Sequence, residues 1–333
     1  MAKLLIDNKD IKFVLRKMFF LVLLCFALML PLPVSSEQGT RPQNPVWMWD
    51  YKEVFYDIAF INKQKAVIVG ARGQILVSHG TYKDLWSPRD SKTEELLTSL
   101  SFIDGKQGWA AGHGGVIIHT ADGGETWEVQ RETSPENLPL FDIQFVSKNI
   151  GYACGAFDTF LKTIDGGKTW KSHPTNLDNI YNGLFFHDAE NGFLVGEFGS
   201  VLKTTDGGKS WNQMNVDGYQ GTLFGITFLS PDKALAYGIT GKLIISHDGG
   251  ENWKDIDPDI KDALFMAAVN GDDVAVVGRT GVMLLSNDGA KSFAIKYEKE
   301  SHTFAGVCSH PQGGFVGVGE FGNILKIEAL KNE

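Results

Sequence analysis

The stretch Thr120-Ala-Asp-Gly-Gly-Glu-Thr-Trp127 decides the fold, because four further copies of it follow along the chain. We call these five stretches the boxes. Their first and last residues are Thr120 and Trp127, Thr163 and Trp170, Thr204 and Trp211, Ser246 and Trp253, and, in a degenerate copy, Ser286 and Phe293. The box aspartates lie 40 to 43 residues apart. A fixed period in the forties indicates a repeat architecture in which each repeat is one structural unit.

Two further patterns share this period, and each occurs seven times. The first is a pair of glycines three residues apart, the second of which opens a short apolar run and is replaced by aspartate in one copy; the second positions are Gly73, Gly115, Asp158, Gly199, Gly241, Gly281 and Gly322. The other is a run with apolar residues at alternate positions, which is a strand signature. These runs span 55–60, 97–102, 140–145, 181–186, 223–228, 264–269 and 304–309.

Four short strands in every forty-odd residues predict an all-β fold, a seven-bladed β-propeller of four-stranded antiparallel blades. The last repeat stops after its third strand, whereas Val46-Trp-Met-Trp49 precedes the first blade without a blade of its own. We expect this N-terminal strand to complete the last blade and close the ring, which would remove an exposed sheet edge. A single propeller is therefore predicted for residues 44–333.

The first 36 residues do not share the repeat. Five basic residues precede an apolar run over 19–30, and Val34-Ser35-Ser36 offers small residues for cleavage. This pattern predicts a secretory signal peptide over residues 1–36, followed by a short linker over 37–43. The apolar run is shorter than the roughly 20 residues of a membrane-spanning helix. We therefore expect an exported protein that does not itself span the membrane.

Charge and cysteine content narrow the function classes. Cleavage would change the formal charge from −9 to −12, because the segment carries five basic and two acidic residues. Such an acidic protein is not expected to bind nucleic acid or anionic lipid by bulk electrostatics. Cys154 and Cys308 fall in separate blades, so buried free thiols are expected rather than a disulfide.

The boxes favour a structural role. Asp followed by Gly-Gly suits a tight turn whose amides bond the carboxylate, and the aromatic residue that ends the box can pack the blade. The structural residues are Asp122, Trp127, Asp165, Trp170, Asp206, Trp211, Asp248, Trp253, Asp288 and Phe293. A calcium site is excluded by ligand count, because one carboxylate and one hydroxyl fall short of six to eight oxygens. The histidines form no metal pattern, and neither a metal nor a cofactor is predicted.

The phrase Ser/Thr-x-Asp-x-Gly-x-x-Trp resembles the Asp-box, or BNR repeat, of sialidases and sortilin-type receptors. With Val-Gly-x-x-Gly before the third strand and Asp-Gly-Gly in the well-formed boxes, the chain from about residue 44 onward is more similar to photosystem II assembly and stability factors. That resemblance implies a non-catalytic scaffold that docks a membrane complex, in the periplasm or, in a photosynthetic host, the thylakoid lumen. It also implies an arginine-rich contact patch, for which this chain offers only Arg72 and Arg279. A different envelope complex, such as an exporter, is the alternative client.

In a propeller, the turns between second and third strands share a face with the starts of the innermost strands. Residues at these positions differ from blade to blade, as expected where a scaffold carries a binding surface. The candidate partner-binding residues are Arg72, Arg279, Tyr56, Asp57, Phe141, Phe157, Glu197, Phe198, Phe224, Glu320 and Phe321. For each phenylalanine the alternative is that it wedges neighbouring blades together.

A carbohydrate-active propeller, either a hydrolase or a lectin, is the alternative function. The carboxylates of Asp57, Asp142, Glu197 and Glu320 could serve a glycosidase if two were about 5 Å or roughly 6.5 to 9.5 Å apart. A sialidase needs three clustered arginines, and of Arg41, Arg72, Arg89, Arg131 and Arg279 only Arg72 and Arg279 map to this face. We therefore predict no catalytic residues and a monomeric protein-docking propeller. A shallow aromatic rim would favour docking, and a deep pocket with paired carboxylates would favour hydrolysis.

Overall fold

The computed structural model describes residues 53–80, 86–134 and 136–330. The chain divides into two units, residues 1–41 and 42–333, and all described residues belong to the second. The expected signal peptide (1–36), linker (37–43) and closing strand Val46–Trp49 lie outside the described residues and stay predictions. In the part of the chain that is described, no helix is long and apolar enough to cross a membrane.

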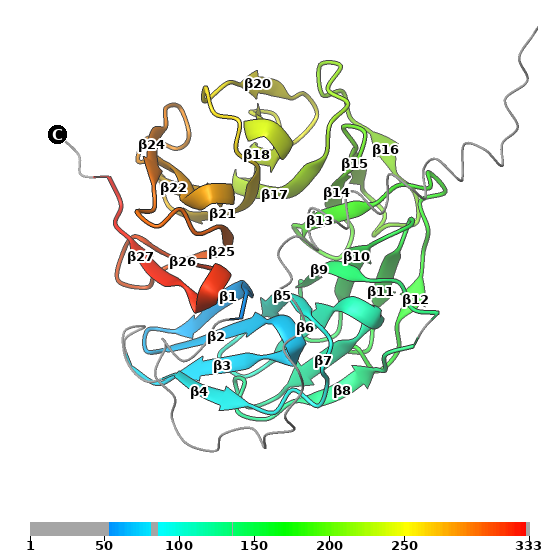
Figure 1. Ribbon diagram of the computed structural model, residues 1–333. Helices are drawn as coiled ribbons and strands as arrows, with labels where there is room; N and C mark the ends of the chain where they lie inside the picture. The colour runs from blue at the N-terminus through cyan, green and yellow to red at the C-terminus, as the bar shows by residue number, and fades with distance from the viewer. Residues whose placement is uncertain (1–52, 81–85, 135, 331–333) are drawn as a thin grey trace, which may run out of the picture. The chain divides into compact units, whose positions relative to one another are not determined.

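The described strands form seven antiparallel sheets around a common centre, which confirms the predicted seven-bladed β-propeller (Figure 1). The innermost strands are β1 (Phe55–Asn62), β5 (Leu97–Phe102), β9 (Leu140–Phe145), β13 (Tyr181–Phe186), β17 (Leu223–Ser230), β21 (Leu264–Asn270) and β25 (Phe304–Ser309). The second strands are β2 (Lys65–Gly70), β6 (Gly108–Gly112), β10 (Gly151–Gly155), β14 (Gly192–Gly196), β18 (Lys233–Gly238), β22 (Asp273–Gly278) and β26 (Phe315–Gly319).

The outer strands follow in sequence order within each blade. The third strands are β3 (Ile75–Ser78), β7 (Ile117–Thr120), β11 (Phe160–Thr163), β15 (Val201–Thr204), β19 (Leu243–Ser246), β23 (Val282–Ser286) and β27 (Ile324–Ile327). The fourth strands are β4 (Trp86–Arg89), β8 (Glu128–Arg131), β12 (Lys171–Ser172), β16 (Asn212–Gln213), β20 (Lys254–Ile256) and β24 (Ala294–Tyr297). Short 3₁₀ turns join second to third strands in five blades: η2 (Ala71–Gly73), η3 (His113–Gly115), η4 (Ile239–Gly241), η5 (Arg279–Gly281) and η6 (Glu320–Gly322).

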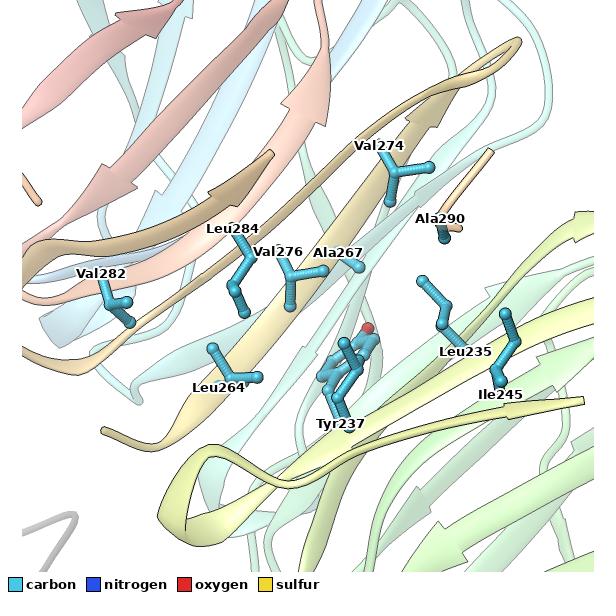
Figure 2. Close-up of a cluster of buried hydrophobic side chains, with 11 residues drawn as sticks. Leu235, Tyr237, Ile245, Leu264, Ala267, Val274, Val276, Val282, Leu284 and Ala290 are labelled. Atoms are coloured by element: carbon cyan, nitrogen blue, oxygen red, sulfur yellow. The ribbon is translucent and has the colours of Figure 1, made fainter. Parts of the chain in front are cut away.

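The hydrophobic core lies between the blades. Figure 2 shows one interface, where Leu235, Tyr237 and Ile245 of the fifth blade pack against residues of the sixth, including Leu264 and Leu284. Each side chain of this size contributes about 1.5–3 kcal/mol when it is fully buried. A similar cluster fills each of the other six interfaces between neighbouring blades. The blades therefore stabilise one another rather than standing alone.

The first and last blades also pack against each other. Phe55 and Trp86 of the first blade share a buried cluster with Val316 and Val318 of the last. The amide of Gly322 donates to the carbonyl oxygen of Glu53 (2.7 Å), which joins the start of the described chain to the last blade. Three strands of the last blade are described, so its completion by Val46–Trp49 remains a prediction.

Each box is held by its own aspartate. In the second box, Asp165 Oδ1 accepts hydrogen bonds from Thr163 Oγ1 (2.8 Å) and the Thr169 amide (2.9 Å). Asp165 Oδ2 accepts one from Thr169 Oγ1 (2.7 Å). These bonds, that from the Thr169 hydroxyl foremost, lower the pKa of Asp165 to about 2. The other four box aspartates accept an equivalent set of bonds.

The aromatic residue of each box packs its blade. Trp127 and Trp253 are buried, and their indole N–H groups donate to Gly124 and Gly250 of the same box (both 3.0 Å). The other three are half-buried: Trp170 stands edge-on to Phe145, Trp211 stands edge-on to Phe160, and Phe293 packs against the cluster of Figure 2. Both described cysteines are free thiols, with Cys154 buried and Cys308 half-buried.

A glycine ends the second strand of every blade, and the backbone needs it there. The amide that follows this glycine donates to the carbonyl just before the innermost strand, at 2.9–3.1 Å in all seven blades. A Cβ added to the glycine would lie 1.9–2.6 Å from that same carbonyl oxygen. Glycine is needed here for steric reasons rather than for a left-handed backbone, because the chain is extended at Gly70 and Gly112.

We expect Gly196→Ala to lower the free energy of unfolding by about 3 kcal/mol, because the new methyl group would collide with the carbonyl of Ile180. Gly105→Ala is the matched control, since its Cβ would come no closer than 3.6 Å to Ile61. Urea unfolding measures the free energy of unfolding of both variants. Equal stability of the two variants would contradict this account of the second-strand glycines.

Candidate functional site

The two ends of the blades carry different kinds of turn. The turns between second and third strands lie beside the starts of the innermost strands, as shown by the pairing of Leu223 with Gly238 immediately before η4. We call this end the turn face. The boxes lie at the other end, where the amide of Gly207 donates to Glu190 in the turn between β13 and β14 (2.8 Å). We call that end the box face.

Three phenylalanines stand at the middle of these turns, on the turn face. Phe157, Phe198 and Phe321 have φ angles of 50°, 56° and 56°. A bulky residue with positive φ is a backbone outlier, because the left-handed region crowds its Cβ. Their side chains are also 45%, 55% and 63% exposed. Strain of this kind concentrates at functional sites, and large apolar side chains are usually buried, so both features single out these residues.

The exposed arginines of this face are Arg72 and Arg279. Arg72 occupies the same left-handed position in the first blade, with a φ of 54°, and lies 3.5 Å from Glu53. Arg131 also reaches the turn face, which the repeat pattern had not indicated. Its guanidinium is committed there, because it donates to the carbonyl oxygen of Gly115 and to Asn137 Oδ1.

Two expected contact residues are not on the surface. Tyr56 and Asp57 are 6% and 7% exposed, because the inner strand that carries them packs between neighbouring blades. Phe141 and Phe224 are half-buried, and they stand edge-on to His113 and Phe265 of adjacent blades. The structure therefore corrects the assignment of Tyr56 and Asp57 to a contact surface. The contacts of Phe141 and Phe224 with adjacent blades favour the wedging alternative for these two residues.

The glutamates Glu197 and Glu320 are half-buried at the same turns. Burial raises the pKa of Glu197 above its ordinary value. Glu320 Oε2 accepts a hydrogen bond from the Thr303 amide at the entrance to β25 (2.9 Å). Both carboxylates therefore lie next to exposed phenylalanines, Glu197 beside Phe198 and Glu320 beside Phe321.

A chain of polar contacts links the inner strands of four blades. Asp57 Oδ2 accepts a hydrogen bond from the Leu100 amide (2.7 Å), and Ser99 Oγ donates to Asp142 Oδ1 (2.8 Å). Asp142 Oδ2 in turn accepts one from the Leu184 amide (2.9 Å). Inner strands are sheet edges, so these side chains satisfy backbone amides that have no strand partner.

Burial is the main cause of a raised pKa at both carboxylates. The pKa of Asp57 rises to about 7, with a further contribution from neighbouring Asp142, and the pKa of Asp142 rises to about 6. Amide donors oppose the rise in both cases. The oxygens of both carboxylates accept bonds that hold the inner strands together; Asp57 is buried and Asp142 is half-buried.

Further exposed apolar residues lie on the turn face, where sequence reasoning had not placed a site. Leu138 and Leu177 belong to segments that lead from a fourth strand to the next blade, and Tyr297 ends the fourth strand β24; they are 37%, 49% and 50% exposed. In the sequence, each of these exposed positions could be recognised only as an apolar residue among polar neighbours. On the box face, Ile164 is 66% exposed.

The turn of the third blade departs from the others. Asp158 stands where the other blades have glycine, and it adopts a φ of 58° directly after Phe157. Its carboxylate accepts hydrogen bonds from the Thr175 amide (2.9 Å), the Asn176 amide (2.7 Å) and the Thr175 hydroxyl. These bonds hold the segment that carries Leu177, so Asp158 positions two exposed apolar residues at once.

Outside residues 1–52, 81–85, 135 and 331–333, no group of three or more His, Cys, Asp or Glu side chains could hold a metal ion. The turn face differs between blades, and three of its turns carry an exposed phenylalanine at a strained position. The class of protein is therefore a repeat β-propeller with aspartate-held turns on one face and exposed aromatic residues on the other.

Comparison with known proteins narrows this class. The sequence model described as "Photosynthesis system II assembly factor YCF48" matches residues 44–139, 130–218 and 175–328. The chain therefore belongs to this family.

A curated relative is the photosystem II stability/assembly factor HCF136, chloroplastic, of Oryza sativa subsp. japonica, with 31% identity over 104 residues. That alignment covers 29% of this chain and 24% of the relative, about a quarter of its length. The solved structure of YCF48 bound to a D1 peptide is similar with a TM-score of 0.70 and 19% identity, covering 90% of this chain and all of that one. YCF48 from Cyanidioschyzon merolae gives a TM-score of 0.68 and 16% identity, covering 84% of this chain and 96% of that one. At these identities the structural similarities concern the fold.

We expect Asp158→Ala to lower the free energy of unfolding by about 2–3 kcal/mol, because it removes a charged acceptor and keeps a side chain at positive φ. Asp158→Gly removes the acceptor but relieves the backbone, so its loss should be about 1 kcal/mol smaller. Urea unfolding of the two variants separates the loss of the carboxylate from the effect of backbone strain. A glycine variant as stable as the wild type would contradict the role of the carboxylate in holding the 173–180 segment.

The raised pKa of Asp57 predicts a loss of stability at neutral to alkaline pH. Because the folded-state pKa lies above the ordinary value, the stabilising contribution is complete below that ordinary value and disappears as the pH rises through about 7. Asp57→Asn should therefore reduce the decline of the urea midpoint between about pH 5 and about pH 8. Asp217→Asn, on an exposed loop, is the control and should leave the decline unchanged. An unaltered decline in Asp57→Asn would contradict the prediction.

Proposed function

We propose that this chain is a protein-docking propeller that binds a subunit or assembly intermediate of a membrane complex through its turn face. The observation that carries the proposal is the presence of Phe157, Phe198 and Phe321 at strained, exposed turn positions on one face. Exposed aromatic anchors on a rigid scaffold are the usual energetic centres of protein interfaces. Family membership supports a client of the photosystem II type, and an exporter or another envelope complex is the alternative client.

The similar YCF48 structure supports the same proposal, since it is of that protein bound to a D1 peptide. In this chain the corresponding contact would be made by the turn-face phenylalanines, with Arg72 and Arg279 beside them. The chain would act as a monomer and without a cofactor. It would act outside the cytoplasm after export by the predicted signal peptide, in the periplasm or, in a photosynthetic host, in the thylakoid lumen.

Docking is favoured over carbohydrate hydrolysis by the state of the carboxylates. Asp57 and Asp142 accept hydrogen bonds from backbone amides of neighbouring blades and hold the inner strands together. Glu320 caps the entrance to β25 through the Thr303 amide. A glycosidase needs one carboxyl group that donates a proton and a second that faces the sugar. These contacts support a scaffold role for the carboxylates instead.

The test is site-specific photo-crosslinking in the native host, with the crosslinker at position 198 on the turn face and, as the matched control, at Ile164 on the box face. We expect a product with a membrane-complex subunit from position 198 and none from position 164. Both positions are exposed, so a difference between them reports the face rather than accessibility.

The triple variant Phe157→Ala, Phe198→Ala, Phe321→Ala should weaken capture of that subunit at least about tenfold, because anchors of this kind dominate interface energies. Its fold should be intact, since all three side chains are exposed. Crosslinking from position 164 alone, or a captured subunit that the triple variant retains fully, would contradict the proposal.

A further inference from the structure

The segments that lead from the fourth strand of one blade to the first strand of the next surround the turn-face phenylalanines, and we call them the connecting loops. They span residues 90–96, 132–139, 173–180, 214–222, 257–263 and 298–303. Backbone hydrogen bonds tie them to the turns, as from the Asp158 amide to Asn179 (2.6 Å) and from the Gly199 amide to Gly221 (2.7 Å). The ring of His302 lies 5.0 Å from that of Phe321. Whatever contacts these phenylalanines therefore also meets the connecting loops.

The connecting loops are strongly acidic. They contain twelve aspartate and glutamate residues and three lysines. The acidic residues are Asp90, Glu94, Glu95, Glu132, Glu136, Asp178, Asp217, Asp257, Asp259, Asp262, Glu298 and Glu300. Nine of the twelve are exposed and the other three are half-buried.

The box face is less negative than the connecting loops. Its boxes and first-to-second-strand turns, leaving out residues 81–85, hold six lysines and twelve acidic residues, five of which are the box aspartates. The connecting loops hold the same number of acidic residues but half as many lysines. The larger excess of negative charge therefore lies on the same face as the exposed phenylalanines.

In the described part of the chain, most of the acidic side chains on the connecting loops form no ion pair. Asp90 pairs with Lys92 (2.7 Å), and Glu300 lies 3.6 Å from His302, which is a cation only when it is protonated. A hollow of about 330 Å³ lies between two connecting loops and is lined by Glu94, Glu95 and Glu132, among others. Its lining carries one cation, Lys92, against these three carboxylates. The negative potential is thus concentrated rather than cancelled.

We propose that the turn face selects a basic protein segment, whose apolar residues contact Phe157, Phe198 and Phe321 and whose lysine or arginine side chains lie over the acidic connecting loops. This inference rests on the docking function proposed above and names the chemistry of its partner. Complementary charge speeds encounter and excludes wrong partners, and apolar anchors supply most of the affinity. Acidic segments, nucleic acid and anionic lipid would be repelled by the same loops.

The test selects a display library of random short peptides on the full chain and, in parallel, on the triple variant Phe157→Ala, Phe198→Ala, Phe321→Ala. We expect the peptides enriched on the wild type, and lost on the triple variant, to be rich in lysine and arginine. An enriched set that is neutral or acidic but still depends on the phenylalanines would overturn the charge inference and leave docking intact. If the same peptides are enriched on the wild type and on the triple variant, the proposed docking function is contradicted, and so is this inference.

A second measurement uses the most enriched peptide and fluorescence anisotropy. The variant Glu94→Gln, Glu95→Gln, Glu132→Gln should bind it about fivefold to tenfold more weakly, and the difference should shrink as salt is raised. The control variant Glu190→Gln, Asp232→Asn, Asp272→Asn removes three exposed carboxylates from the box face and should bind like the wild type. Equal weakening in both variants would show a general charge effect and would overturn the assignment to the connecting loops.

Discussion

The propeller depends on one close approach that recurs in every blade. The second strand ends on a glycine whose backbone lies against the carbonyl that precedes the innermost strand, and the next amide donates to that carbonyl. This contact fixes where the innermost strand begins and where the turn to the third strand must start. Because seven copies of it surround the centre, seven turns are presented at one end in similar orientation. The turn face is a consequence of that constraint.

The same constraint explains why the turns can tolerate strain. Each turn is held on both sides, by the strand pairs of its own blade and by a bond to the segment that precedes the innermost strand of that blade. A held backbone can keep a bulky residue at positive φ, which a free loop would relax. Four of the seven equivalent positions carry smaller or flexible residues, Arg72, Gly114, Thr240 and Thr280, whereas the other three carry phenylalanine. The repeat therefore fixes the backbone of the turns, and the residues that differ between repeats determine the chemistry of the turn face.

Much of the fold was predictable because the repeat signals are local. The boxes, the glycine pairs and the period-two runs mark the ends of strands directly, so the expected inner runs match β1, β5, β9 and their equivalents almost residue for residue. Exposure was harder to predict, since Tyr56 and Phe198 both stand at non-repeating positions. Only packing separates them: Tyr56 lies between two blades, whereas Phe198 projects from a turn.

Two other features show the limits of pattern reading. The acidity of the connecting loops is visible in the sequence, but its meaning requires knowing that six separate segments meet on one face. In the sequence, Asp158 is only a substitution for the glycine of the repeat. In the structure, its carboxylate accepts hydrogen bonds that organise the neighbouring loop. In both cases the information is distributed over residues far apart in the chain. The fold brings them together, and only then does the surface have a recognisable chemistry.

The central claim is that the phenylalanines of the turn face are kept for binding at the expense of backbone strain. The most direct measurement compares folding and partner binding in Phe198→Gly. The account predicts a gain of about 0.5–1 kcal/mol in the free energy of unfolding, because glycine accepts the left-handed conformation, together with weaker binding. A variant that is less stable and binds as well as the wild type would contradict the account, because Phe198 would then be a packing residue.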